Sequence, residues 1–291
     1  MPSLDDLKKR IKSVKSTQKI TKAMKMVAAA KLRKAQENAE RGRPYSQKMQ
    51  NIILNLTKSI NDPDNAPKLL VGTGKDKTYL CVVLTADRGL CGGFNSNICK
   101  LAKTKFKKII NEGKDLKIIT VGSKGLDQIK REYGKFIIKK FSFKEKKIIS
   151  FNEAEIIGKE IINLFNQDGF DKCFLFYNNF KNVITQIPQA QQIIPAENNS
   201  SSSKEEYLSY EFEPDEDEIL EDLLPKNITT QIFRAFLENA ASEQGSRMTA
   251  MDNATRNAGD LVDKLTINYN RSRQASITKE LIEIISGAES L

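Results

Sequence analysis

The sequence predicts an α/β fold in which a long helix at each end of the chain pairs with the other as an antiparallel coiled coil. Two observations predict it. Apolar or small residues recur every three or four positions near both ends, which is the spacing of a coiled-coil seam. Between the ends, short apolar runs alternate with helical stretches, which is typical of a parallel α/β domain. We therefore expect two shaft helices around one inserted domain.

The first helix is predicted over about residues 4–60, within an N-terminal shaft segment of residues 1–60. Ser3 can cap it, and Asp5 and Asp6 complement its positive end. Gly42 and Pro44 interrupt its middle, so we expect a bend or a break there. The seam runs through Leu4, Leu7, Ile11, Val14, Thr21, Met24, Ala28, Leu32 and Ala35.

Residues 68–214 are predicted to form a Rossmann-like α/β domain. Apolar runs predict strands at 79–85, 117–121 and 172–177, and helical patterns predict helices at 95–111, 123–133 and 151–167. Added strands are expected at 183–194 and 207–212, with a polar loop at 198–206 between them.

The last helix is predicted to begin at Pro225, because proline is favoured in a first turn, and to dominate residues 215–291. At about 1.5 Å per residue, each terminal helix would be roughly 80–90 Å long. Since such a helix with a small and polar seam needs a partner, we expect 215–291 to pair with 1–60. The seam is predicted at Phe233, Phe236, Ala240, Gln244, Met248, Met251, Thr255, Ala258, Leu261, Leu265, Tyr269, Ser272 and Ser276.

Composition limits the chemistry open to the chain. It has 291 residues and no histidine, which excludes Ser-His and Cys-His catalysis. The four cysteines lack CxxC spacing and lie in or beside apolar segments, so we expect buried, reduced thiols and no bound metal or cofactor. No stretch is long and apolar enough to span a bilayer, and no targeting segment is expected at the start.

Charge is distributed unevenly along the chain. Residues 1–58 hold eleven lysines and four arginines against four acidic residues, a net charge of +11, whereas the whole chain carries +10. Residues 205–222 hold ten acidic residues and no basic one. Such a polarised chain predicts different partners for its two ends.

Three segments resemble the gamma subunits of F-type ATP synthases, and together they span the chain. They are TQKITKAMKMVAAAKLR at 17–33, TADRGLCGGFN at 85–95 and RQASITKELIEIISGA at 273–288. The resemblance implies a bacterial central-stalk rotor, a peripheral protein at the cytoplasmic face of the inner membrane. Its partners would be three alpha and three beta subunits, the epsilon subunit and the membrane c ring. It implies no catalysis by this chain, no small-molecule substrate, and membrane association only through the complex.

The resemblance also implies which residues touch those partners. Residues that match the alpha and beta contacts are Met24, Lys25, Arg33, Gln244, Arg247, Arg273, Gln274, Thr278 and Glu280; those that match the c-ring and epsilon contact are Tyr210, Glu211, Phe212 and Glu213. The family often has an acid where this chain has Lys25, which raises the question of repulsion between basic groups. For each of these residues the alternative is an ordinary solvated helix face or acidic loop.

Two other functions remain as alternatives. The basic N-terminal helix could bind nucleic acid, although its lysines lack interleaved aromatic residues. The glycine-bearing turn at 87–93 follows a strand as a phosphate-binding loop would, but it lacks GxGxxG spacing. We expect a structural turn there, and no enzyme site in the α/β domain.

Overall fold

The computed structural model describes residues 3–59, 67–146, 149–195 and 216–289. It divides into two compact units, one made of residues 1–30 and 247–291 and the other of residues 31–246. Helix α1 (Leu4–Ser59) and helix α6 (Glu216–Glu289) contribute to both units. We describe the first as the coiled-coil unit and the second as the α/β unit.

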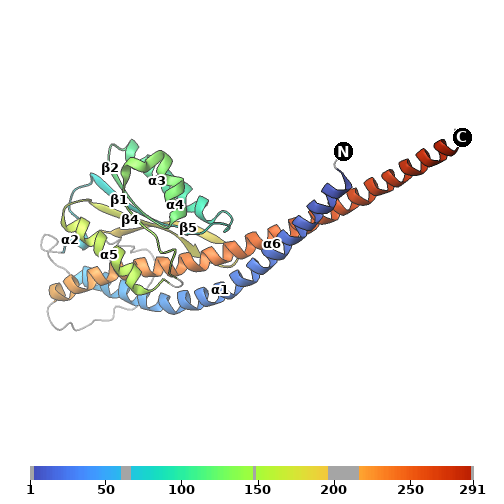
Figure 1. Cartoon of the computed structure of the whole chain (residues 1–291). Helices are drawn as coiled ribbons and strands as arrows, with labels where there is room; N and C mark the ends of the chain where they lie inside the picture. The colour runs from blue at the N-terminus through green and yellow to red at the C-terminus, as the bar shows by residue number, and fades with distance from the viewer. Residues whose placement is uncertain (1–2, 60–66, 147–148, 196–215, 290–291) are drawn as a thin grey trace. The chain divides into compact units, whose positions relative to one another are not determined.

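The two long helices pair in antiparallel fashion within each unit, as the sequence predicts (Figure 1). In the coiled-coil unit, Thr255 Oγ1 donates to Thr21 Oγ1 over 2.8 Å. In the α/β unit, Arg43 Nε lies 2.7 Å from Glu238 Oε1. The residue number falls along α6 as it rises along α1, which defines the antiparallel arrangement.

Helix α1 continues through Pro44, so of the two expectations, a bend or a break, the break does not occur. Pro44 removes one backbone donor, but the flanking turns are held by burial of Ala39, Ser46 and Met49. Gly42 allows close packing beside it: a Cβ on this residue would lie 2.8 Å from Leu237 Cδ1. Tertiary packing therefore outweighs the local signals for interruption.

Helix α6 begins at Glu216, nine residues before the predicted start, and Pro225 lies inside it. The extra turns are stabilised by burial: Leu220 and Leu224 join Met49 and Ile53 of α1 in one apolar cluster. Leu70, on the short helix α2 (Lys68–Val71), completes that cluster. The predicted start was wrong because proline marked a possible first turn, whereas contacts with α1 and α2 stabilise helical turns that precede Pro225.

The α/β unit contains one five-stranded sheet with the order β3-β2-β1-β4-β5. The adjacent pairs β3–β2, β2–β1 and β1–β4 are parallel, and β5 is antiparallel to β4. This confirms the Rossmann-like α/β prediction. The strands are β1 (Thr78–Leu84), β2 (Asp115–Val121), β3 (Ile137–Phe141), β4 (Lys172–Phe180) and β5 (Gln186–Ile194).

Helices cover both faces of the sheet (Figure 1). Helix α3 (Phe94–Asn111) and helix α4 (Ser123–Tyr133) pack on the face that carries Cys81 and Val83, and the 3-10 turn η1 (Gly134–Phe136) follows α4. Helix α5 (Phe151–Asn166) and part of α6 pack on the face that carries Leu80 and Val82. One helix of the shaft pair is thus also a layer of the α/β core.

The strands of the middle of the chain differ from prediction in several places: β4 ends at Phe180, three residues after its predicted end, and β2 begins at Asp115, two residues before its predicted start. Strand β3 was not predicted, because at the sheet edge most of its side chains are exposed and its lysines mask the apolar pattern. Strand β5 begins at Gln186, three residues after the predicted start. All four cysteines are buried and none forms a disulfide, which agrees with the prediction of buried, reduced thiols. The strand predicted at 207–212 lies outside the described residues.

Candidate functional site

The seam of the coiled-coil unit is narrow and made mostly of small or aliphatic side chains. Buried residues there are Leu7, Thr21 and Ala28 of α1 and Met251, Ala258, Val262 and Leu265 of α6. The predicted seam position Leu261 is 40% exposed and the next residue, Val262, is buried in its place. Outside this seam, aliphatic side chains such as Ile20, Val27 and Ile267 are more than half exposed on the outer faces, where partner contacts are predicted.

Lys25, the departure from the family pattern, is paired within the chain. Its Nζ lies 2.5 Å from Asp252 Oδ1 on α6. Arg256 also pairs with Asp252, one helical turn away. Hydrogen bonds from Lys25 and then from Arg256 lower the pKa of Asp252 below its usual value. The carboxylate of Asp252 thus partly neutralises two cations and reduces the repulsion that was expected around Lys25. Asp252 was not among the residues singled out from the sequence.

The other predicted contact residues of the shaft fall into two groups. Arg33 is exposed and its guanidinium approaches Glu37, one turn on, at 3.4 Å. Met24, Gln244 and Arg247 are half-buried in their respective units. Of these four side chains, Arg33 is therefore the most accessible to a partner, and the other three are partly covered by neighbouring residues of the chain.

The last turns of α6 have a different surface. Arg273, Gln274, Thr278 and Glu280 are all exposed. Between and beyond them are five exposed aliphatic side chains, which are 50–72% exposed: Ile277, Leu281, Ile282, Ile284 and Ile285. Isolated exposed apolar residues are ordinary, but five on one short helical segment indicate a surface that another protein covers.

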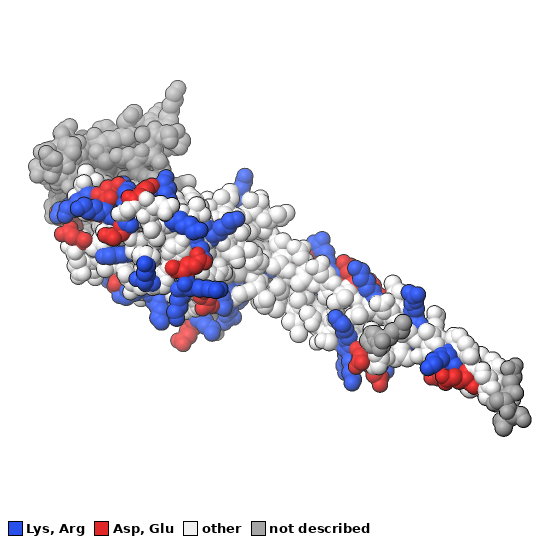
Figure 2. All heavy atoms as spheres, turned by 90° about the horizontal axis from the view of Figure 1, so that it is seen from above, with Lys and Arg blue, Asp and Glu red and all other residues white. Residues whose placement is uncertain are grey.

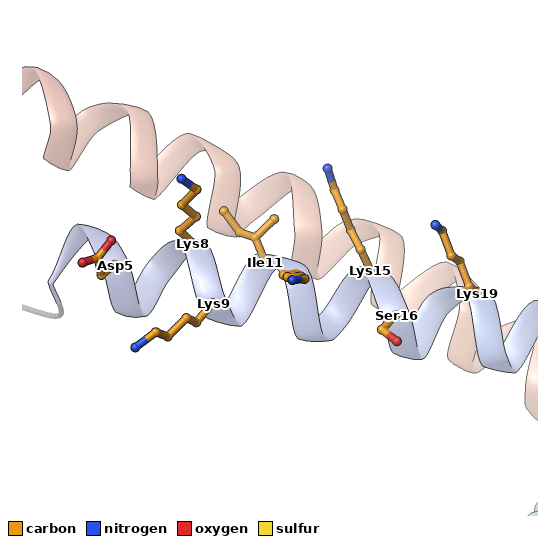
Figure 3. Close-up of a pocket in the computed structure, with 8 residues that line it drawn as sticks. Asp5, Lys8, Lys9, Ile11, Lys15, Ser16 and Lys19 are labelled. Carbon is orange, nitrogen blue, oxygen red and sulfur yellow. The ribbon is translucent and has the colours of Figure 1, made fainter.

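The N-terminal part of α1 presents a basic groove (Figure 3). Its lining consists of Asp5, Lys8, Lys9, Ile11, Lys12, Lys15, Ser16 and Lys19. Five lysines against one aspartate make this surface strongly positive, which favours an acidic partner surface. Over the face of the α/β unit seen in Figure 2, by contrast, basic and acidic side chains are interspersed.

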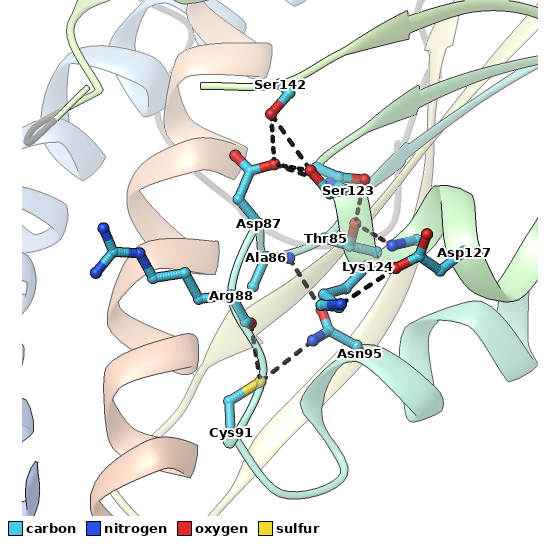
Figure 4. Close-up of polar contacts among 12 residues, drawn as sticks. Thr85, Ala86, Asp87, Arg88, Cys91, Asn95, Ser123, Lys124, Asp127 and Ser142 are labelled. Carbon is cyan, nitrogen blue, oxygen red and sulfur yellow. Dashed lines mark hydrogen bonds and ion pairs between the residues drawn. The ribbon is translucent and has the colours of Figure 1, made fainter. Parts of the chain in front are cut away.

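Hydrogen bonds between Asp87 and neighbouring segments hold the glycine-bearing turn after β1 in place (Figure 4). Asp87 accepts hydrogen bonds from the backbone and hydroxyl of Ser123, from the Ser142 hydroxyl and from the Phe143 backbone. Burial alone would raise the pKa of Asp87, but these hydrogen bonds outweigh it and the pKa lies below its usual value. The carboxylate thus ties the turn to the ends of β2 and β3, in keeping with the predicted structural turn.

Tyr210, Glu211, Phe212 and Glu213, the predicted c-ring and epsilon contact, lie outside the described residues. Within the described part of the chain, no helix is long and apolar enough to cross a membrane. The same part holds no group of three or more histidine, cysteine or acidic side chains placed to bind a metal ion.

Fold and surface together define a class of protein: a helical shaft with an α/β domain, whose exposed features suit contact with other proteins. Comparison with known proteins identifies the family. The family model described as ATP synthase matches residues 3–291. The chain therefore belongs to the ATP synthase family, among its gamma chains, the rotor of the central stalk.

Two bacterial relatives match this chain along their whole length, and two solved structures match most of it. The chain is 72% identical to the ATP synthase gamma chain of Pelagibacter ubique and 58% identical to that of Rhizobium leguminosarum, with complete coverage of both proteins in each case. A chain in the structure of the central stalk and c ring of Tetrahymena thermophila mitochondrial ATP synthase is 28% identical, with a TM-score of 0.61 over 81% of this chain and 99% of that one. A chain of the Euglena gracilis mitochondrial ATP synthase shares the fold, with a TM-score of 0.68, 19% identity and coverage of 99% and 94%.

Proposed function

We propose that this chain is a non-catalytic rotor subunit that couples ion flow through a membrane c ring to ATP synthesis or hydrolysis in an alpha-beta hexamer. Catalysis would reside on the beta subunits, and the rotor would regulate both ATPase activity and ion flow. An asymmetric shaft acts by making different contacts with each surrounding subunit as it turns, which shifts each one between conformations. Family membership along the full chain supports the rotor role, and the exposed end of α6 supports how it engages its partners.

The exposed aliphatic side chains at the end of α6 are the observation that carries the proposal. Burying an aliphatic side chain stabilises by up to roughly 1.5–3 kcal/mol, so a sleeve of partner subunits around Ile277, Leu281, Ile282, Ile284 and Ile285 would hold the shaft end. Apolar contact is non-directional. Such a sleeve therefore permits rotation, which a ring of fixed hydrogen bonds would resist.

Polar residues on the shaft would supply the angle-dependent contacts. We assign alpha and beta contacts to Arg33, Arg273, Gln274, Thr278 and Glu280, which are exposed. Met24, Gln244 and Arg247 are half-buried, and we assign the same contacts to the part of each side chain that is accessible. Lys25 is retained too, although its pairing with Asp252 directs part of its charge into the shaft itself.

The remaining partners would be three alpha and three beta subunits, an epsilon subunit and the c ring. The contact of Tyr210, Glu211, Phe212 and Glu213 with the ring and epsilon stays a prediction. We place the chain at the cytoplasmic face of a bacterial inner membrane, attached through the complex, because the relatives that resemble it most among those named are bacterial. None of the named relatives or structures is a nucleic-acid-binding protein, so that alternative has no support from them.

Reconstitution with alpha and beta subunits tests the proposal. We expect a stable complex with one copy of this chain per three alpha-beta pairs, and ATP hydrolysis that depends on the chain. Removing residues 277–291 should leave the α/β unit folded and lower both complex stability and hydrolysis. A complex that neither forms nor gains activity, under conditions in which another gamma chain assembles, would contradict the rotor role.

A further inference from the structure

Strand β4 extends beyond its neighbour β1, which leaves part of one strand edge without a strand partner. The parallel pairing with β1 runs from Tyr79–Lys172 to Val83–Phe176. Strand β4 continues to Phe180, and β5 pairs with it on the other side along that extension. Backbone groups of Asn178 and Phe180 on the β1 side thus need other partners, because a buried backbone group without a hydrogen bond is costly.

Side chains of the shaft helices supply all four missing hydrogen bonds. The Asn178 N–H donates to Asn239 Oδ1 at 3.1 Å, and the Asn178 carbonyl accepts from Ser242 Oγ at 3.1 Å. The Phe180 N–H donates to Glu238 Oε2 at 3.1 Å, and the Phe180 carbonyl accepts from Arg43 Nη2 at 3.1 Å. Arg43 lies on α1 and the other three on α6, so both helices take the place of the missing strand.

Charge strengthens this junction. The Glu238 side chain is only 2% exposed, and Arg43 binds it through two nitrogens, with Nε at 2.7 Å and Nη2 at 3.0 Å. Planar, two-point pairing of guanidinium with carboxylate fixes direction as well as distance. Beside it, Gly42 brings α1 close to Leu237 of α6. The α1 helix, the α6 helix and the sheet are therefore joined at one place by directional bonds.

The junction contains directional hydrogen bonds, which apolar packing alone would not provide. The core between α6 and the sheet consists of aliphatic and aromatic contacts, including Ile232 and Phe236. Such contacts resist separation but have little directional preference. Hydrogen bonds weaken steeply when their angle changes, so the junction resists twisting of the helices relative to β4.

We propose that Arg43, Glu238, Asn239 and Ser242 are positioning residues that transmit torque between the α/β domain and the shaft helices. The proposal rests on the proposed rotor function. It assigns coupling to the polar junction between the shaft pair and the end of β4, in addition to the apolar core. Weakening the junction lets the shaft turn without carrying the α/β domain fully with it.

The test uses the complete enzyme in membrane vesicles and measures ATP hydrolysis and ATP-driven ion uptake in the same preparation. Proton and sodium uptake are both followed. The variants are Arg43→Ala, Ser242→Ala and the conservative Arg43→Lys. The matched control is Lys226→Ala, which removes an exposed ion pair with Asp222 on the same α6 helix. Amounts of assembled complex are measured so that rates refer to assembled enzyme.

We expect Arg43→Ala to keep the rate of ATP hydrolysis per complex but to lower the number of ions moved per ATP by about twofold or more. A loss of about twofold is expected if the hydrogen bonds between the shaft helices and β4 are broken half of the time. Arg43→Lys should recover part of that loss, and Lys226→Ala should match the unaltered enzyme. Amide exchange at Phe180 should become about tenfold faster in Arg43→Ala, because a charge-assisted bond network is lost.

A purely structural role predicts something else: less assembled complex, with an unchanged number of ions per ATP. That result, together with faster exchange at Phe180, would overturn the proposal. If Arg43→Ala does not fold, Ser242→Ala and Arg43→Lys give the same comparison with smaller perturbations. If the unaltered chain does not assemble at all, the proposed function fails and this inference fails with it.

Discussion

At the scale of single residues, the ion pair between the two shaft helices shows how a charge placed unfavourably in the sequence is accommodated. Lys25 faces Asp252 across the helix pair, and Arg256 shares the same carboxylate. Exposed ion pairs contribute little to stability on their own. Their value here is to fix the register of two helices whose seam is a narrow row of small and aliphatic residues, which has little directional preference of its own.

Replacing Asp252 by asparagine should lower the thermal stability of the coiled-coil unit at pH 7. The hydrogen bonds from Lys25 and Arg256 hold the pKa of Asp252 below its usual value of 3.8, so the carboxylate contributes stability above that pH. The contribution is lost as the pH falls through the lower pKa of the folded state. Circular dichroism melting of both proteins should therefore show a difference at pH 7 that shrinks towards pH 2.

Asp222→Asn provides the control, because Asp222 forms an exposed pair with Lys226 of the same helix. It should change the melting temperature less at neutral pH. An Asp252→Asn effect that is the same at both pH values would contradict the ionic interpretation.

At the scale of elements, helix α5 is specified at its start by local chemistry. Ser150 donates from its backbone N–H and its hydroxyl to Glu153 Oε2, at 2.8 Å and 2.5 Å. In return, the backbone N–H of Glu153 donates to the Ser150 side chain, which completes the capping box between the residue before the helix and the third residue inside it. Those bonds, led by the one from the Ser150 hydroxyl, lower the pKa of Glu153 to about 2.

Glu153→Gln should therefore flatten the acid dependence of stability in the α/β unit. The usual pKa of this carboxyl is 4.5, so its contribution is complete above that pH and is lost as the pH falls through about 2. Urea unfolding between pH 7 and pH 2.5 should show the two proteins converging in acid. Ser150→Ala should cost about 0.5–2 kcal/mol at neutral pH, and an unchanged urea midpoint would contradict the assignment of the cap.

The contact between α5 and α6 depends on a glycine. A Cβ at Gly158 would lie 2.6 Å from Thr229 Oγ1 and 3.6 Å from Thr229 Cα, so Gly158→Ala should force the helices apart. We expect a loss of about 1–3 kcal/mol of unfolding free energy, which exceeds the gain of about 1 kcal/mol from helix propensity. Gly287→Ala, where the space around the Cβ is open, is the control and should not destabilise. Equal effects of both changes on urea unfolding would refute the close-packing argument.

At the scale of the whole molecule, the uneven charge of the chain bears on assembly. The first 58 residues hold a net charge of +11, and the lysine-lined groove on α1 belongs to that segment. Opposite charges accelerate association more than they strengthen the final complex. Salt screens such attraction over about 10 Å at 0.1 M.

Association with the alpha-beta hexamer should consequently slow as salt rises, while dissociation changes little. Replacing Lys8, Lys12 and Lys15 together by glutamine should reduce both the association rate at low salt and its salt dependence. Stopped-flow measurements from 0.02 to 0.3 M salt, a range set by the screening length, provide the check. Replacing Lys100, Lys107 and Lys108 of α3 by glutamine removes the same charge elsewhere and is the control. An equal effect of the two triple changes would show that net charge, and not the groove, governs association.

Much of the architecture was predictable because its causes are local. Helix α4 was predicted with its observed bounds, Ser123–Tyr133, and α3 and α5 within one residue at each end. Apolar periodicity and capping residues act over a few positions, so sequence alone reveals them. The same periodicity predicted that two long terminal helices pair, and segment resemblance predicted the family.

The sequence by itself thus determined the two paired shaft helices, the inserted α/β domain, the buried thiols and the family. Tertiary structure decided the rest: the continuity of α1 through Pro44, the start of α6 at Glu216, the edge strand β3, and the pairing of Lys25 with Asp252. It also decided the junction in which Arg43 and Glu238 replace a missing strand beside Phe180. Each of these depends on groups far apart in the chain, whose burial and hydrogen bonding exist only once the chain has folded.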